Sequence, residues 1–438
     1  MTKILVLSDD GVASGFGRIS MTLNTALHKR GYHVMAASIQ YDALLPPQYE
    51  GVTLPYWVAS LAGKNWPQEM LKLITVYDPD IVMVIQDAPY GEQIRNLPVD
   101  WSKYAFVMIT PVDGLPILPS WIDTMRKADA ALTISQFGVN GYRQTGVHVR
   151  LCQPGIDANV FYRLSDSERL ALRAKVNIAP DAFVWGMFAQ NQGRKDITAT
   201  VLAFYEFAKD KPRARLLLDM DAVSPAGWNI PALCQQFGLD PSKIIFREDA
   251  IKAGITHIRE RYNLLDLHSV LAHREGFGLP LVESMACGVV TMALDWCSGT
   301  EIVGDGKGLL IRPIPYASVS TWGNALDKFA DPAHIVAEAQ RMYDHPHERA
   351  VIAEKGMAWA RQQSWTNAID NTVAAIEEAL KKHAPSTVVA QPITMSLPTA
   401  MPQSVDGNKE GAIMTIGNPP APQHLAGVGI GLTETIAG

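Results

Sequence analysis

Two glutamates, Glu275 and Glu283, bracket a glycine-containing turn in the second half of the sequence. The segment leaves an apolar run that ends near residue 272, turns through Gly276 and Gly278, and continues into a stretch of helical character. A turn between a strand and a helix exposes free amide groups, and these amides and the helix dipole favour an anion. Two carboxylates beside a phosphate-binding turn suit a nucleotide sugar, which carries both phosphate and hydroxyl groups.

Two adjacent cations, Arg194 and Lys195, lie between a predicted strand at residues 183–188 and a predicted helix. From this position both side chains can point into a cleft. Breaking a bond between a sugar and a phosphate leaves negative charge on the nucleoside diphosphate, and fixed cations in a dry site stabilise that charge. We therefore predict that both residues act in catalysis without a metal ion. Asn191, in the same loop, is predicted to contact the nucleotide sugar.

The segment at residues 273–288, His-Arg-Glu-Gly-Phe-Gly-Leu-Pro-Leu-Val-Glu-Ser-Met-Ala-Cys-Gly, resembles the signature of glycosyltransferase family 4. That family contains retaining enzymes with the GT-B fold. The resemblance implies that Glu275 positions the hydroxyls of the donor sugar and that Glu283 holds the ribose. It also implies a set of donor-binding residues around the turn: Gly276, Phe277, Gly278, Leu279 and Glu283.

Other segments extend the resemblance over about residues 3–380. The loop at residues 9–18 contains Gly15 and Gly17 and follows the first predicted strand, as the glycine loop of the family does. The segments at residues 154–161 and 298–303 resemble the family's interdomain Pro-Gly-x-Asp segment and its Glu-Ile-Val helix start. We expect Gly15 and Gly17 to approach the donor.

The sequence departs from the family at two positions. Where the family usually places an arginine ahead of the lysine, this chain has Gln190, so Arg194 is the candidate for that duty. Where many members have a histidine facing the donor sugar, this chain has the segment 110–116 with Asp113. Asp113 is included among the catalytic candidates because a carboxylate there could bind the donor sugar or orient the acceptor, although it could also open a turn with Gly114.

The elements that must position these residues follow an alternating strand and helix rhythm. Continuous apolar strands separated by helices predict a parallel sheet covered on both faces, and the rhythm restarts near residue 180. We expect an α/β protein of GT-B architecture, with two Rossmann-like doubly wound domains facing across a cleft. The predicted acceptor-side domain covers residues 1–160 and the predicted nucleotide-sugar domain covers residues 175–325.

Beyond these domains the pattern becomes helical from about residue 317 to 382. We expect helices over residues 326–383 that return across the cleft and pack on both domains. Residues 384–438 are rich in Pro, Ala, Ser, Thr and Gly. Such a composition cannot bury enough surface to offset the entropy of ordering, so a disordered tail is predicted.

Composition narrows the functional class. The net charge of −6 over 438 residues includes no basic block, and this gives no electrostatic support for nucleic-acid binding. Four scattered cysteines suggest reduced thiols in a cytoplasmic protein. No apolar stretch approaches the roughly 20 residues needed to span a bilayer, which leaves peripheral membrane association open.

Three alternatives remain open from the residues alone. Asp219-Met220-Asp221 matches an acid-x-acid metal-binding pattern, although the two cations argue for a metal-free site. A nicotinamide-dependent oxidoreductase would leave Glu275 and Glu283 unused, and the loop at residues 11–17 lacks the dinucleotide fingerprint. An inactive glycosyltransferase-like binding or scaffold protein is the third.

The predicted reaction moves a sugar from a UDP-, GDP- or ADP-sugar to an acceptor hydroxyl, with no further cofactor. The acceptor class stays open among a glycan, a lipid, a small molecule, a protein and a nucleic acid. The oligomeric state is also open.

Overall fold

The computed structural model describes residues 1–12, 14–41, 48–49, 52–321 and 323–383. These residues fall in a single compact unit, Met1–Ser386. The predicted disordered tail at residues 384–438 lies outside the described residues.

The first half of this unit is built on a seven-stranded parallel sheet with the order β5-β2-β1-β6-β7-β8-β9. In chain order its strands are β1 (Lys3–Ser8), β2 (His33–Ser38), β5 (Trp57–Ser60), β6 (Ile81–Ile85), β7 (Ala105–Thr110), β8 (Ala130–Thr133) and β9 (Arg150–Leu151). Every residue of β6 and β7 is buried, because helices cover both faces of the sheet. A short antiparallel pair, β3 (Gln48–Tyr49) and β4 (Val52–Thr53), stands apart from the sheet.

Alternate residues of these strands pack on opposite helical layers. Ile4 and Val6 of β1 belong to the core under α1 (Gly15–Lys29) and α15 (Trp365–Lys382). Leu5 and Leu7 point the other way. They join the core formed with α2 (Trp66–Tyr77), α3 (Ala88–Arg95), α4 (Pro119–Lys127) and α5 (Gln136–Gln144).

The second half contains a six-stranded parallel sheet with the order β12-β11-β10-β13-β14-β15. Its strands are β10 (Val184–Phe188), β11 (Arg215–Asp219), β12 (Ile244–Phe246), β13 (Leu267–Val270), β14 (Val290–Leu294) and β15 (Leu309–Ile311). On one face lie α7 (Ile197–Phe207), α8 (Ile230–Gln236) and α13 (Pro332–Asp344). The other face packs with α9 (Arg247–Lys252), α10 (Ile258–Tyr262), α11 (Leu279–Ala286) and α12 (Ser298–Val303). The remaining helices are α6 (Asp166–Lys175), α14 (Pro346–Ala360) and the short 3-10 turns η1 (Gly193–Lys195) and η2 (Pro241–Lys243). The prediction of two doubly wound α/β sheets is confirmed.

The helical prediction from residue 317 onward is wrong at its start. The structure instead has an antiparallel pair, β16 (Pro313–Val319) and β17 (Leu326–Ala330), before α13 begins. Leu326 donates its amide hydrogen to the carbonyl oxygen of Leu115 at 2.8 Å. The pair is therefore held by the first half of the chain, a contact that local helix-like spacing could not reveal.

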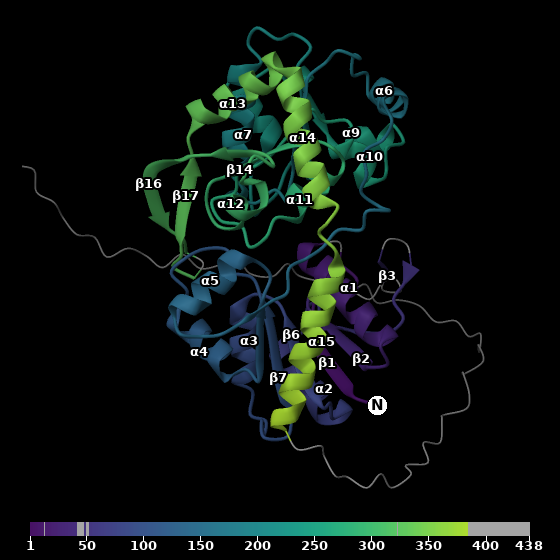
Figure 1. Cartoon of the computed structure of the whole chain (residues 1–438), viewed down its shortest axis with the longest axis vertical. Helices are drawn as coiled ribbons and strands as arrows, with labels where there is room; N and C mark the ends of the chain where they lie inside the picture. The colour runs from purple at the N-terminus through teal and green to yellow at the C-terminus, as the bar shows by residue number, and fades with distance from the viewer. Residues whose placement is uncertain (13, 42–47, 50–51, 322, 384–438) are drawn as a thin grey trace, which may run out of the picture. The chain divides into compact units, whose positions relative to one another are not determined.

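One apolar core cluster runs through both halves. It includes Val6 of β1 in the first half, Val282 of α11 in the second half, and Ile376 of α15. Figure 1 shows how the chain passes from α14 into α15, which returns to the first sheet beside α1 and β7. The last helix thus completes the domain in which the chain began.

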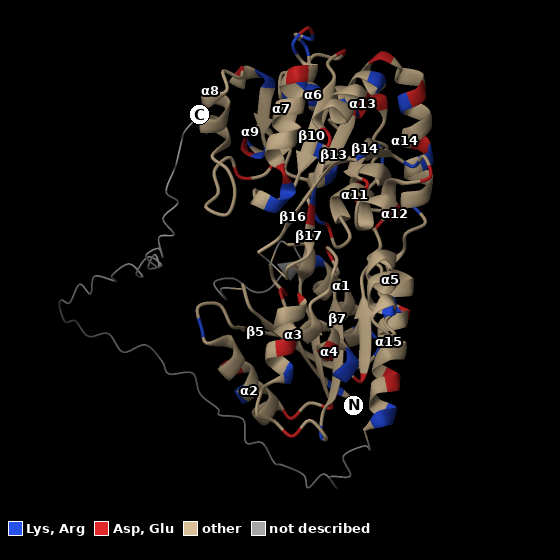
Figure 2. Ribbon diagram, turned by 90° about the vertical axis from the view of Figure 1, so that its left-hand side faces the viewer, with Lys and Arg blue, Asp and Glu red and all other residues tan. Residues whose placement is uncertain are grey.

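Along both halves, Lys and Arg positions are interspersed with Asp and Glu positions rather than gathered by sign (Figure 2). Among the described helices none is long and apolar enough to cross a membrane.

Candidate functional site

Lys195 and Glu275 meet at the carboxyl edge of the second sheet. Lys195 ends η1, which follows β10, and Glu275 lies in the loop between β13 and α11. Because β10 and β13 are neighbours in the sheet, their following loops lie side by side. The ammonium group of Lys195 donates a hydrogen bond to the Glu275 carboxylate, and Arg194 Nη1 lies 3.8 Å from the same oxygen. The structure therefore brings both predicted cations together with the first acid of the turn.

The side chains of Lys195 and Glu275 are largely buried, at 13% and 17% exposed, whereas that of Arg194 is 37% exposed, and the electrostatics of the cluster follow from this partial burial. Burial alone would raise the pKa of the Glu275 carboxyl, but Lys195 and Arg194 outweigh it and hold that pKa below its ordinary value. For Lys195, burial and the neighbouring Arg194 lower the pKa of the ammonium group, while Glu275 opposes them. The site thus holds a dry carboxylate beside two cations, an arrangement suited to a ligand with both hydroxyl and anionic groups.

The glycine turn is shaped by its own backbone and by the first half of the chain. Gly278 is the residue before α11 and has a φ of +91°, a conformation that L side chains rarely adopt. A Cβ on Gly276 would lie 2.8 Å from Cβ of Pro111. Ser298 fixes the turn by donating its hydroxyl hydrogen to the carbonyls of Glu275 and Phe277 at 2.8 and 2.9 Å.

The residues predicted to line the donor differ in whether their side chains are available to a ligand. The Phe277 ring belongs to the apolar core, so only its backbone can serve a ligand. Leu279 begins α11 and lines a pocket together with Glu283.

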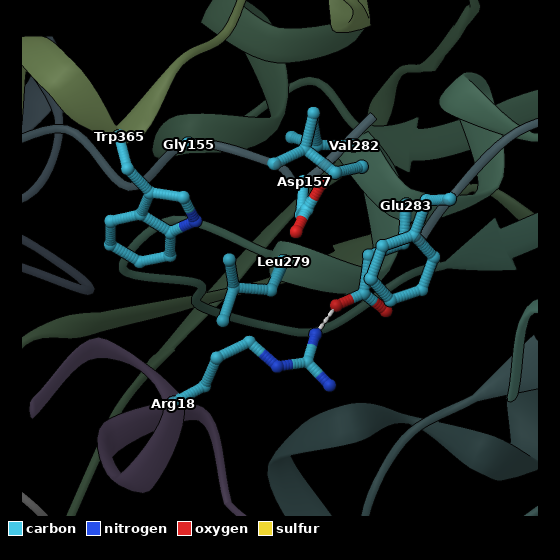
Figure 3. Close-up of a pocket in the computed structure, with 9 residues that line it drawn as sticks. Arg18, Gly155, Asp157, Leu279, Val282, Glu283 and Trp365 are labelled. Carbon is cyan, nitrogen blue, oxygen red and sulfur yellow. Dashed lines mark ion pairs between the residues drawn. The ribbon is translucent and has the colours of Figure 1, made fainter. Parts of the chain in front are cut away.

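That pocket is small, with a volume of about 20 Å³, and lies where the first half, the interdomain segment, α11 and α15 converge. Figure 3 shows Arg18, Asp157, Leu279, Glu283 and Trp365 around it. Glu283 is only 4% exposed and accepts a hydrogen bond from the Tyr262 hydroxyl at 2.8 Å. Arg18 of α1 reaches across from the first half and forms an ion pair with the same carboxylate.

The N-terminal glycine loop approaches this pocket through Arg18. Ser14 caps α1 by accepting a hydrogen bond from the amide of Gly17 at 2.9 Å. A Cβ on Gly17 would lie 2.0 Å from the carbonyl oxygen of Val12, so the loop itself requires glycine there. At Gly15, in contrast, a Cβ would meet no atom within 4 Å. Of the two predicted donor-binding glycines, Gly15 has the open backbone and Gly17 serves packing within the loop.

Comparison with known proteins finds similarity to glycosyltransferases. The sequence model described as "Glycosyl transferases group 1" matches residues 254–331, which include Glu275 and Glu283. D-inositol 3-phosphate glycosyltransferase of Stackebrandtia nassauensis is 28% identical over 257 residues, covering 57% of this chain and 53% of that protein. O-antigen chain mannosyltransferase B of Escherichia coli is 34% identical over 101 residues, covering 23% and 22%.

The chain is similar to the group 1 glycosyltransferases over residues 254–331, and to a D-inositol 3-phosphate glycosyltransferase over 57% of its length. It spans about half the length of the D-inositol 3-phosphate glycosyltransferases it matches.

Solved structures show that this chain has the GT-B fold. Sucrose-phosphate synthase from Thermosynechococcus elongatus aligns with a TM-score of 0.68 at 17% identity, covering 87% of this chain and all of that one. The Anabaena protein HepE, solved in complex with UDP-glucose, aligns with a TM-score of 0.64 at 18% identity and covers 86% of this chain. The predicted fold class is therefore confirmed.

Asp113, which stands where the resembled family often has histidine, is paired in this structure. Both oxygens of its carboxylate lie 3.2 Å from Nη1 of Arg274. Arg274 is buried and also bonds Asp327 of β17 at 2.5 Å. A Cβ on Gly114 would lie 2.7 Å from Cδ of Arg274, so the turn that Asp113 opens lies directly on this guanidinium.

Asn191 braces a loop. Its amide group donates to the carbonyls of Asp221 and Trp228 at 3.0 and 2.8 Å, and its oxygen accepts from the Trp228 amide at 2.9 Å. Because the side chain is fully committed, a donor contact at this position would have to come from the backbone.

The two aspartates of the acid-x-acid pattern at 219–221 each form an ion pair with a different arginine. Asp219 pairs with the buried Arg261, and the more exposed Asp221 pairs with Arg247. Each carboxylate thus has a cationic partner already. In the described residues no group of three or more His, Cys, Asp or Glu side chains is placed to hold a metal ion.

Sequence reasoning did not single out several residues of the site. Arg18 contacts Glu283 from the opposite half, and Arg274 bridges Asp113 and Asp327. Asp87 lies two residues after β6, close enough to Asp113 and Arg194 that the first raises its pKa and the second lowers it. The available signal for Asp87 was its place at the carboxyl end of a buried strand, and for Arg274 its position beside Glu275.

Proposed function

We propose that this protein transfers a sugar from a nucleotide-sugar donor to an acceptor hydroxyl, with retention at the anomeric carbon and without a metal ion. The observation that supports this most directly is the convergence of Lys195 and Arg194 on Glu275 beside the glycine turn. Those groups match the two ends of the bond that must break, with cations for the diphosphate and a carboxylate for the sugar hydroxyls.

In the proposed step, the bond between the anomeric carbon and the diphosphate oxygen breaks, and the electron pair leaves with the nucleoside diphosphate. The acceptor hydroxyl attacks from the face of the leaving group and forms the new glycosidic bond. Its proton passes to the departing phosphate oxygen, so no external base is needed. Lys195 and Arg194 stabilise the charge that develops on the diphosphate.

The remaining residues have binding roles in this proposal. Glu283 holds the ribose, and its carboxylate is oriented by the Tyr262 hydroxyl. Amides at the start of α11, after Gly278, line the phosphate. Contacts between the two halves, such as that of Gly276 with Pro111, exclude water and protect the donor from hydrolysis.

The proposal is tested with a panel of UDP-, GDP- and ADP-sugars, by measuring release of nucleoside diphosphate in the presence of EDTA. We expect at least one donor to bind and to be slowly hydrolysed, with product of retained anomeric configuration by NMR. Loss of turnover with EDTA and its recovery with Mg²⁺ or Mn²⁺ would disprove the metal-free mechanism. Failure to bind any nucleotide would favour a scaffold role.

A further inference from the structure

Three neighbouring strands of the first sheet end in carboxylates. Asp9 follows β1, Asp87 follows β6 by two residues, and Asp113 follows β7 by three. These strands lie side by side in the order β1-β6-β7. Because the carboxyl ends of parallel strands share one edge, the three acids lie along the same border of the sheet. This border faces the donor cations, since Arg194 and Arg274 act electrostatically on Asp87.

Two of these carboxylates lack a strong partner in the described part of the chain. Asp9 is 2% exposed and forms no ion pair among the described residues. Its buried Oδ1 makes no hydrogen bond of normal geometry, Oδ2 has a 3.4 Å contact with Gln40, and the Gln86 amide is the other polar neighbour of the carboxylate. Asp87 occupies the position before α3 but does not cap that helix, and no hydrogen bond or ion pair engages its side chain among the described residues. Asp113, in contrast, is held by Arg274.

A neighbouring acid in the same region, unlike these two, is fully hydrogen-bonded. Asp10, next to Asp9, accepts hydrogen bonds from Ser8, Asn24 and Tyr56 at 2.8, 3.0 and 2.5 Å. A buried polar group without a partner costs stability, so it is retained where it has a ligand to bind. Burial and the neighbouring Asp113 raise the pKa of Asp87 to about 7, because Arg194 and Arg274 oppose that rise but do not outweigh it.

The first half of the chain supplies almost no positive charge at this border. The segments that follow β1, β2, β6, β7 and β8 contain no Lys or Arg before the next helix or the next strand of the sheet. Lys64, after β5, is exposed and donates to the carbonyl of Ser60, and Arg18 is paired with Glu283. The cations that do face the border come from the second half. Arg274 is paired with Asp113 and Asp327, and Lys195 and Arg194 are assigned to the donor diphosphate.

We propose that the acceptor group entering this border is an uncharged, hydroxyl-rich compound, such as a sugar or polyol, and that it carries no phosphate near the reacting hydroxyl. Asp9 and Asp87 accept hydrogen bonds from its hydroxyl groups. This inference rests on the proposed function, because the border is an acceptor site only if the adjoining cations hold a nucleotide sugar.

Charge distinguishes neutral hydroxyl compounds from phosphorylated ones as acceptors at this border. A hydroxyl can donate a hydrogen bond to a carboxylate, and so it can supply the hydrogen bond that Asp9 Oδ1 lacks. A phosphomonoester has little to donate at neutral pH, and its charge is repelled by Asp9, Asp87 and the donor diphosphate in a site of low dielectric. Phosphorylated acceptors require Lys or Arg, which this border lacks in its own half.

The test uses the full-length protein and the donor found to be hydrolysed. Matched acceptors are offered at equal concentration: glucose and glucose 6-phosphate, fructose and fructose 6-phosphate, and myo-inositol and inositol 3-phosphate. A small-molecule and glycan extract, separated on an anion exchanger, is offered in parallel with labelled donor. We expect label in the unretained fraction, and any neutral probe that reacts to be used at least tenfold better than its phosphorylated twin.

Each outcome of this test bears on either the inference or the proposed function. Transfer confined to retained, phosphatase-sensitive compounds, or no transfer to any neutral hydroxyl compound while the donor is hydrolysed, overturns the inference and leaves the proposed function standing. Absence of donor binding and hydrolysis refutes the proposed function itself, and the inference falls with it.

A variant series assigns the effect to this border. Asp87→Asn keeps the shape of the side chain and should lower kcat/KM for the neutral acceptor at least tenfold, mostly through KM. Asp87→Lys should shift preference toward the phosphorylated twin. Asp123→Asn, on the exposed face of α4 and paired with Lys127, is the matched control. Unchanged acceptor kinetics in a folded Asp87→Asn protein would also overturn the inference.

Discussion

At the scale of single residues, Lys195 carries the largest expected share of the chemistry. Its ammonium group is buried against Glu275 and has Arg194 beside it, so its charge is little screened by water. We expect Lys195→Ala to lower kcat by about 100-fold, the size typical for loss of one preorganised group at a developing charge. Donor KM should change far less. Steady-state kinetics with the exposed Lys72→Ala as control provide the check, and equal kinetics in both variants would contradict the assignment.

Glu283 is expected to act in binding. In Glu283→Gln the Tyr262 contact can persist, whereas the ion pair with Arg18 is lost. If the carboxylate holds the ribose, the affinity for nucleoside diphosphate should fall about tenfold, which corresponds to about 1.4 kcal/mol. Isothermal titration calorimetry measures this directly. Tighter binding in the variant would mean that the Arg18 ion pair competes with the ligand, and would refute the ribose role.

Asp87 should impose a pH dependence on stability. Its pKa is about 7 in the folded protein against an ordinary 3.8, with burial as the main cause. Because folding favours the protonated form, this contribution is complete below about pH 4 and is lost as the pH rises through 7. Asp87→Asn should therefore match the wild type at pH 4 and be more stable at pH 8, by about 1–3 kcal/mol. Thermal melts at several pH values, with Asp123→Asn as control, measure this; a constant difference would contradict it.

At the scale of elements, the β16–β17 pair couples the two halves through Arg274. This guanidinium is buried among Asp113, Asp327 and Ser320. Removing it in Arg274→Ala leaves two carboxylates without their partner and should destabilise the protein by about 3–5 kcal/mol. The free energy of unfolding from denaturant titration tests this, with the exposed Arg143→Ala of α5 as control. A loss no larger than that of the control would show that the bridge is not stabilising.

The same elements show where sequence reasoning succeeds and fails. The apolar runs that became β6 and β7 and the acid pair around the glycine turn are local patterns, and they could be predicted. The β16–β17 pair could not, because its strands are short and depend on Leu115 and Arg274, which are far away in the sequence. The border formed by Asp9, Asp87 and Asp113 required the order of the strands, which no single segment contains.

At the scale of the whole molecule, the two halves should unfold together. One core cluster runs from β1 to α11 and α15, and Glu301 of α12 accepts hydrogen bonds from the amides of Gln136 and Phe137 in the first half. Calorimetry should therefore show one main transition rather than two. Two well-separated transitions, one of them shifted by nucleoside diphosphate, would mean that the halves are thermodynamically independent.

The return of α15 to the first sheet has a consequence for how the chain is made. Ribosomes deliver the N-terminal strands first, yet the face that α15 covers, including the surface around Cys152 and Ile376, is closed only when residues near 382 emerge. Domains usually fold one after another during synthesis. This chain must instead keep an apolar sheet face open through the translation of its entire second half, which makes its nascent form a natural client for chaperones.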